Sequence, residues 1–220
     1  KPFLDKIHSQ HKALKKSANL RQDFTANVSH ELKTPLMSIS GYAELIESGI
    51  AQGEDTVRFA GEIHKSSQRL LTLINDILRL SQLDSVEECV DTEPVDLYEM
   101  ALNCQDMLEM QANKHQVVVR VKGRSEVVQA NRRMMDELIY NLCDNAIRYN
   151  RVGGSVNVTI GEEAQHPFVS VKDTGIGVSK EDQERIFERF YRVDKSRSKQ
   201  TGGTGLGLAI VKHIAVMHKA

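Results

Sequence analysis

The chain has 220 residues, of which 40% are hydrophobic and 27% charged, an ordinary composition for a globular protein. Its formal net charge of −1 provides no basic field, so we expect no nucleic-acid partner. No apolar run is long enough to span a membrane. The three cysteines lack paired metal-ligand spacing, and their odd number argues against a disulfide framework, so we expect a reducing, cytosolic setting.

The first 84 residues predict two long helices. Apolar residues recur there at alternating three- and four-residue steps, a pattern typical of helices packed at shallow angles. The two stripes are Leu36, Ile39, Ala43 and Ile46, and then Phe59, Ile63, Leu70, Leu73, Ile77 and Leu80. Residues 49–55 contain two glycines and predict the turn. Because two helices alone bury only a thin core, we expect a dimeric four-helix bundle; a monomeric hairpin docked on the second domain is the alternative.

An acidic stretch around Pro94 predicts a linker over residues 85–95, between a helical domain at 1–84 and a second domain at 96–220. The second domain combines helical and strand patterns. Helices are predicted at 97–113, 134–149 and 208–217, and strands at 116–121, 126–130, 155–160 and 168–172. Segregated helices and short strands indicate an α/β sandwich.

The first helix carries a histidine on its water-facing side. Phe24, Val28, Leu32 and Leu36 recur at four-residue steps and predict the buried face. At about 100° per residue, His30 lies roughly 200° from both Val28 and Leu32. We therefore expect its imidazole to point into solvent.

Two further polar side chains accompany His30. Thr34 lies about 40° around the helix from it, and Glu31 flanks the same edge. A carboxylate that accepts the proton of one ring nitrogen fixes the tautomer and leaves the other nitrogen free to attack. Most exposed histidines on helices are ordinary surface residues. A zinc-protease helix would need a second histidine where Thr34 stands, so the cluster favours phosphoryl transfer to nitrogen.

The second domain contains candidate nucleotide-binding segments. Asn141 and Asn145 share one helix face, and an amide carbonyl oxygen is a hard ligand suited to Mg²⁺. Residues 173–177 place a carboxylate at a strand end, where it can accept a hydrogen bond from an adenine amino group. Residues 202–207 are glycine-rich and open the last helix, so that backbone N–H groups can meet phosphates. The spacing differs from that of a P-loop and from the dinucleotide fingerprint. Each segment alone also fits an ordinary turn or a solvated helix face.

Taken together, these segments resemble a known family. Residues 29–36, Ser-His-Glu-Leu-Lys-Thr-Pro-Leu, resemble the H-box of sensor histidine kinases, with surroundings most similar to the phosphate- and cell-wall-sensing branch. The later segments, with an F-box at 186–192, resemble the GHKL-type ATP-binding domain shared with gyrase and Hsp90-like ATPases. The resemblance covers residues 24–217. Relatives continue beyond the final helix with two more strands, so it implies a domain that lacks its last strands.

The resemblance also implies residue roles. His30 is then the phosphorylated residue, Glu31 its acid/base partner, and Thr34 the residue that acts in dephosphorylation of the response regulator. Asn145 is the implied Mg²⁺ ligand. The implied nucleotide-binding residues are Asn141, Asn145, Arg148, Tyr149, Asp173, Gly175, Gly177, Arg192, Gly203, Thr204, Gly205, Leu206 and Gly207. We expect residues 178–200, with the cations Lys195, Arg197 and Lys199, to form a lid that neutralises the triphosphate.

The implied activity is autophosphorylation of His30 from Mg-ATP, followed by transfer to an aspartate of a response regulator receiver domain. The implied protein is a homodimer that acts at the cytoplasmic side of the membrane through segments outside this chain. Two alternatives remain open. A GHKL ATPase that drives a clamp would share the nucleotide motifs without needing the His-Glu-x-x-Thr face. A phosphorelay scaffold would bind nucleotide poorly.

Overall fold

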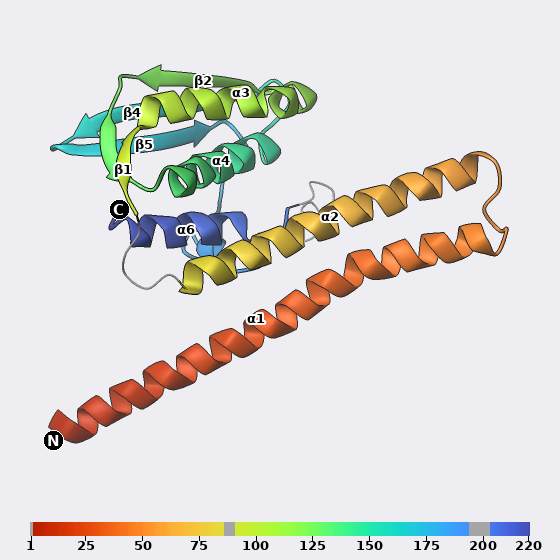
Figure 1. Cartoon of the computed structure of the whole chain (residues 1–220), viewed down its shortest axis with the longest axis horizontal. Helices are drawn as coiled ribbons and strands as arrows, with labels where there is room; N and C mark the ends of the chain where they lie inside the picture. The colour runs from red at the N-terminus through yellow and green to blue at the C-terminus, as the bar shows by residue number, and fades with distance from the viewer. Residues whose placement is uncertain (1, 86–90, 194–202) are drawn as a thin grey trace. The chain divides into compact units, whose positions relative to one another are not determined.

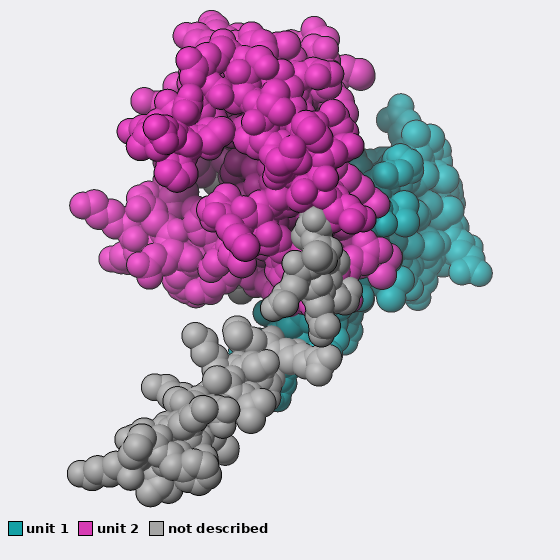
Figure 2. Space-filling view, turned by 60° about the vertical axis from the view of Figure 1, so that its left-hand side comes forward, with its two compact units in different colours: residues 1–75 teal, residues 76–220 magenta. Residues whose placement is uncertain are grey.

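The computed structural model describes residues 2–85, 91–193 and 203–220 (Figure 1). The chain divides into two compact units, Lys1–Asn75 and Asp76–Ala220 (Figure 2). Within the described ranges, no helix combines the length and the apolar character that a membrane crossing requires. The middle of the expected linker, residues 86–90, lies outside the described residues.

Unit 1 contains the two predicted helices. They are α1 (Pro2–Glu47) and the N-terminal part of α2 (Glu54–Ser85). Gly49 and Gly53 in the intervening turn have φ values of 73° and 58°, in the left-handed region that side chains other than glycine seldom adopt. The rings of Tyr42 and Phe59 pack across the hairpin with their centroids 5.1 Å apart. The predicted helical hairpin is confirmed.

The last position of the expected buried face of α1 is exposed in the single chain. Leu36 is 57% exposed, whereas the neighbouring Pro35 is buried. Successive residues on a helix are about 100° apart, so a face centred on Pro35 leaves Leu36 outside it. Phe24, Val28 and Leu32 are half-buried. Pro35 does not end the helix, which continues for twelve further residues to Glu47.

Unit 2 is an α/β sandwich, as predicted. Its main sheet has the order β2-β4-β5, with β2 (Val118–Gly123) parallel to β4 (Ser155–Glu163) and β4 antiparallel to β5 (His166–Asp173). Figure 1 shows α3 (Leu97–His115) and α4 (Arg132–Arg148) stacked on this sheet, followed by α6 (Gly207–Met217). Val156, Val158 and Ile160 alternate along β4 and are buried, which gives the sheet its apolar inner face.

One strand was not predicted. β1 (Glu93–Asp96) pairs antiparallel with β3 (Val127–Ala130), inside the stretch that was expected to be linker. Acidic residues and proline are depleted in strands, so this segment carries little local strand signal. Val95, which is fully buried, anchors β1 to the rest of the unit. The tertiary contact therefore outweighs the local preference.

Candidate phosphotransfer and nucleotide site

The imidazole of His30 lies on the water-facing side of α1. Its side chain is 80% exposed, as the helical geometry predicted. Glu31 Oε1 is 3.9 Å from His30 Nδ1, and Glu31 Oε2 is 3.6 Å from Arg69 Nη2 on α2. The Thr34 hydroxyl donates a hydrogen bond to the backbone carbonyl of His30 at 3.2 Å. The structure thus gathers the three residues that the H-box singled out, and it adds Arg69 as a second neighbour of Glu31.

In unit 2, the last two turns of α4 face the start of α6. Asn141 Nδ2 donates to the carbonyl of Glu137 at 2.8 Å, which fixes its amide. A Cβ atom placed on Gly207 would lie 2.8 Å from Asn141 Oδ1 and 3.7 Å from Asn145 Nδ2. A side chain at position 207 would therefore fill the space in front of both amides. Glycine at position 207 thus lets the backbone at the start of α6 approach both amides closely.

Tyr149, at the end of α4, connects the two glycine segments. Its carbonyl accepts a hydrogen bond from Ile176 N at 3.2 Å, and it would lie only 2.4 Å from a Cβ on Gly175. Its hydroxyl would lie 3.1 Å from a Cβ on Gly203. Asp173 Oδ1 accepts from Gly175 N at 2.7 Å, which holds the carboxylate at the end of β5. Segments far apart in the sequence thus lie together at the C-terminal end of α4.

The remaining expected nucleotide-binding residues differ in how they are placed. Gly177 and Gly205 have φ values of 71° and 76°. Arg148 pairs with Asp144 at 2.6 Å on its own helix, whereas the family resemblance implied that it binds the nucleotide. The side chain of Leu206 is fully buried, so only its backbone can face a ligand.

Arg192 is half-buried in the loop after the 3₁₀ helix η1 (Arg185–Phe187). Gly202 and the expected lid cations lie outside the described residues; these cations are Lys195, Arg197 and Lys199.

These residues fit a magnesium-bound nucleotide. Two amide side chains and glycine backbone stand together where a Cβ would intrude. Amide oxygens are hard ligands of the kind that Mg²⁺ accepts, usually together with water and substrate phosphates. Among the described residues, no group of three or more His, Cys, Asp or Glu side chains is arranged to hold a metal ion. Asn145 is the ligand that the family resemblance implied.

The charged residues at the C-terminal end of α2 make contacts that were not predicted from the sequence. Asp76 accepts a hydrogen bond from the Thr204 hydroxyl at 2.6 Å, and Arg79 Nε donates to Glu137 Oε2 at 2.6 Å. The sequence did contain an indication of this contact. Leu73, Leu80 and Leu83, which are buried, follow a heptad-like spacing, and Asp76 occupies the position between Leu73 and Leu80 where an apolar residue would be expected. A carboxylate in an apolar stripe indicates a specific polar contact.

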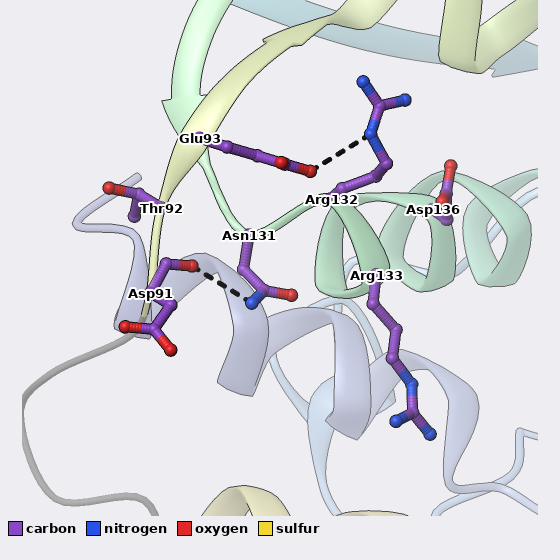
Figure 3. A pocket seen from close by; sticks show the side chains of 7 residues that line it. All are labelled: Asp91, Thr92, Glu93, Asn131, Arg132, Arg133 and Asp136. Atoms are coloured by element: carbon purple, nitrogen blue, oxygen red, sulfur yellow. Dashed lines mark hydrogen bonds and ion pairs between the residues drawn. The ribbon is translucent and has the colours of Figure 1, made fainter.

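A separate hollow of about 530 Å³ lies around the N-terminus of α4 (Figure 3). Arg132 Nε donates to Glu93 at 3.1 Å, and Asn131 Nδ2 donates to the carbonyl of Asp91 at 3.1 Å. At 1.5 Å per residue, Arg132 is about 20 Å along the helix from Asn145. This hollow therefore does not belong to the candidate nucleotide site.

Comparison with known protein families assigns both parts of the chain. Residues 20–86 match the His Kinase A (phospho-acceptor) domain, and residues 130–220 match the histidine kinase-, DNA gyrase B- and HSP90-like ATPase family. The first match contains His30, and the second contains every expected nucleotide-binding residue. A phospho-acceptor domain joined to an ATPase-like domain defines a histidine kinase core.

Curated relatives agree with this class. The chain is 40% identical over 200 residues to the sensor-like histidine kinase SenX3 of Mycolicibacterium smegmatis, which covers 90% of this chain and 52% of that protein. It is 37% identical over 202 residues to the sensor histidine kinase WalK of Bacillus subtilis, covering 90% and 33%. The chain thus spans between a third and about half of the length of these relatives.

A solved structure is also similar. Full-length ShkA in complex with AMPPNP superposes with a TM-score of 0.62 at 26% identity, covering 89% of this chain and 41% of that one. The chain belongs to the sensor histidine kinases.

Proposed function

We propose that the chain transfers the γ-phosphoryl group of ATP to His30 and then to an aspartate of a response regulator receiver domain. The observation that carries the proposal is the 80% exposed imidazole of His30 beside Glu31, in one chain with an ATPase-like domain. An ATPase that drives a clamp does not need an exposed histidine beside a carboxylate. The proposal covers this chain, which is only part of the length of its relatives.

The phosphoryl step uses the two nitrogens of the imidazole differently. Glu31 is placed at Nδ1, 3.9 Å away, so the distal Nε2 is the nucleophile. Its lone pair forms the bond to the γ-phosphorus as the bond to the ADP oxygen breaks. The ring then carries positive charge, and Glu31 accepts the Nδ1 proton. Arg69, at 3.6 Å, holds the Glu31 carboxylate in position.

Asn141, Asn145, Tyr149, Asp173 and the segment at residues 203–207 bind the nucleotide in this proposal. Asn145 holds Mg²⁺, which neutralises charge on the phosphate oxygens. Support comes from the glycine backbone that approaches the two amides closely and from the AMPPNP bound to ShkA. The glycine segment opens α6, whose N-terminus adds partial positive charge toward the phosphates.

The partner and the assembly belong to the same proposal. The regulator docks on the face of α1 around His30, where Thr34 positions a water for hydrolysis of the aspartyl phosphate. A second copy of the chain covers the exposed leucines of α2 and completes a four-helix bundle. The complete protein acts at the cytoplasmic side of the membrane, anchored by segments outside this chain.

The test is incubation of the 220-residue chain with Mg²⁺ and γ-labelled ATP. We expect an acid-labile, alkali-stable phosphoprotein, and we expect the His30→Ala variant to lose at least 99% of the label because it lacks the attacking nitrogen. His64→Ala is the matched control, since His64 is also exposed on a helix of unit 1, and it should label like the wild type. Label retained in His30→Ala would contradict the proposal.

A further inference from the structure

The last turns of α2 are anchored in unit 2. Leu80 and Leu83 are buried there, and the polar residues around them contact elements of the candidate nucleotide site. His213 Nε2 on α6 lies 3.0 Å from the carbonyl of Leu83. The side-chain contacts are Asp76 with Thr204, Arg79 with Glu137, and Asp84 with Arg189 and His213. We call residues 76–84 the docking segment.

Asp76 engages the glycine loop itself. Thr204 is 7% exposed and is the one buried polar residue among those whose burial the structure describes. Its hydroxyl donates to Asp76 Oδ2 at 2.6 Å and accepts from Leu206 N at 3.3 Å. A hydroxyl has a single proton to donate. While Asp76 holds that proton, Thr204 cannot donate to a phosphate oxygen.

The charge of Asp76 also opposes an incoming anion. Burial raises the pKa of Asp76, and the nearby carboxylates of Glu137 and Asp144 raise it further, while the Thr204 hydroxyl and Arg148 lower it. Glu137 and Asp144 are each paired with an arginine, Arg79 and Arg148, so the carboxylate that opposes the triphosphate at this loop is that of Asp76. Like charges in a partly desolvated setting repel more strongly than in water. Removal of the Asp76 carboxylate should therefore favour the nucleotide.

We propose that Asp76 is an autoinhibitory residue that competes with the nucleotide phosphates for the Thr204 hydroxyl, so that the docked segment and bound ATP exclude each other. This inference rests on the nucleotide site of the proposed function. The apparent affinity then equals the intrinsic affinity multiplied by the fraction of molecules whose docking segment is released. Because α2 continues from unit 1 into unit 2, ATP binding would release the ATP-binding domain from this end of the helix.

The experiment is calorimetric titration of the 220-residue chain with AMPPNP and Mg²⁺. We expect Asp76→Ala to bind about tenfold more tightly than the wild type, the equivalent of one charge-assisted hydrogen bond. Asp76→Asn keeps an acceptor for Thr204 but loses the charge, so its affinity should be intermediate. This nearly isosteric variant also keeps the test valid if Asp76→Ala unfolds. Asp106→Ala removes an exposed aspartate from α3 and is the control for net charge.

Two further measurements isolate the contact. In a Thr204→Val background, Asp76→Ala should change the affinity less than twofold, because the shared hydroxyl is already gone. Amide hydrogen exchange across residues 76–84 should speed up when AMPPNP is added to the wild type.

The inference is overturned if the wild type binds AMPPNP and both Asp76 variants bind it as Asp106→Ala does. It is also overturned if the exchange of residues 76–84 does not change. If neither the wild type nor any variant binds AMPPNP, the nucleotide site itself fails, and the inference falls with it.

Discussion

Gly175 lies where two segments of the nucleotide-binding domain approach each other too closely for any side chain. A Cβ atom there would be 2.4 Å from the carbonyl of Tyr149 and 2.7 Å from Asp173 Oδ1. Gly175→Ala must therefore displace the carboxylate and the end of α4 together. We expect about a tenfold loss of AMPPNP affinity, measured by calorimetry, because the displaced Asp173 carboxylate loses a charge-assisted hydrogen bond to the nucleotide.

Gly153→Ala is the matched control. Gly153 has a φ of 76°, and a Cβ atom at this position would have no other atom within 4 Å. Its substitution should cost about 1 kcal/mol of stability through backbone strain and leave the AMPPNP affinity unchanged. Wild-type affinity in Gly175→Ala would show that this loop does not contact nucleotide.

His30 and Asp76 illustrate what a helical pattern can and cannot predict about single residues. The exposure of His30 followed from its angle relative to Val28 and Leu32, because the α-helix has a fixed rotation per residue. The partner of Asp76, by contrast, is 128 positions away in the chain. No local pattern relates these two positions, so only the folded chain identifies Thr204.

Asp96 ends β1 and begins α3, so its side chain determines how these two elements join. Its carboxylate accepts from the backbone N–H groups of Tyr98 and Glu99, at 2.8 and 3.4 Å. Loss of such an N-cap costs about 1 kcal/mol. We therefore expect Asp96→Ala to lower the free energy of unfolding by about that amount at pH 7, measured by urea unfolding followed by circular dichroism.

The stabilisation by Asp96 should depend on pH. A hydrogen bond from the Ser125 hydroxyl, followed by those from the backbone N–H groups, lowers the pKa of Asp96 below its usual value of 3.8. The stabilisation is thus complete above pH 3.8 and is lost as the pH falls through the lowered pKa of the folded state. Asp96→Ala and the wild type should converge below that pKa. A constant difference across this range would contradict the role of the carboxylate.

The secondary structure was predicted well where the apolar pattern was strong and poorly where a contact decided it. The α4 and β4 patterns have clear periods of 3.6 and two residues, and both elements form within a few residues of the expected bounds. β2 begins at Val118, two residues late, because Gln116 adopts a φ of 55° to end α3. β1 was missed because its partner strand, β3, supplies the stability that its composition lacks.

The exposed surface of α2 bears on the assembly of the whole protein. Leu71, Ile74 and Leu78 are all exposed, and their spacing puts them on one face. We expect the chain to be a dimer in sedimentation experiments, and we expect Leu71→Glu to shift it toward monomer by placing a charge in the interface. Leu102→Glu, at an exposed leucine of α3, should leave the dimer intact. A monomeric wild type at tens of micromolar would contradict the bundle.

The sequence by itself determined the helical hairpin, the α/β class of the second domain, the exposed histidine and the family. Each of these depends on residues close together in the chain, whose spacing is visible as a period or a motif. Only the tertiary structure decided that β1 joins β3, that Arg148 pairs with Asp144, and that Asp76 holds Thr204. The pairing of β1 with β3 and the contact of Asp76 with Thr204 each join residues far apart in the chain. Arg148 lies four residues from Asp144 on α4, and its surroundings in the folded chain determine that it pairs with this carboxylate. These contacts depend on which surfaces pack together when the chain folds.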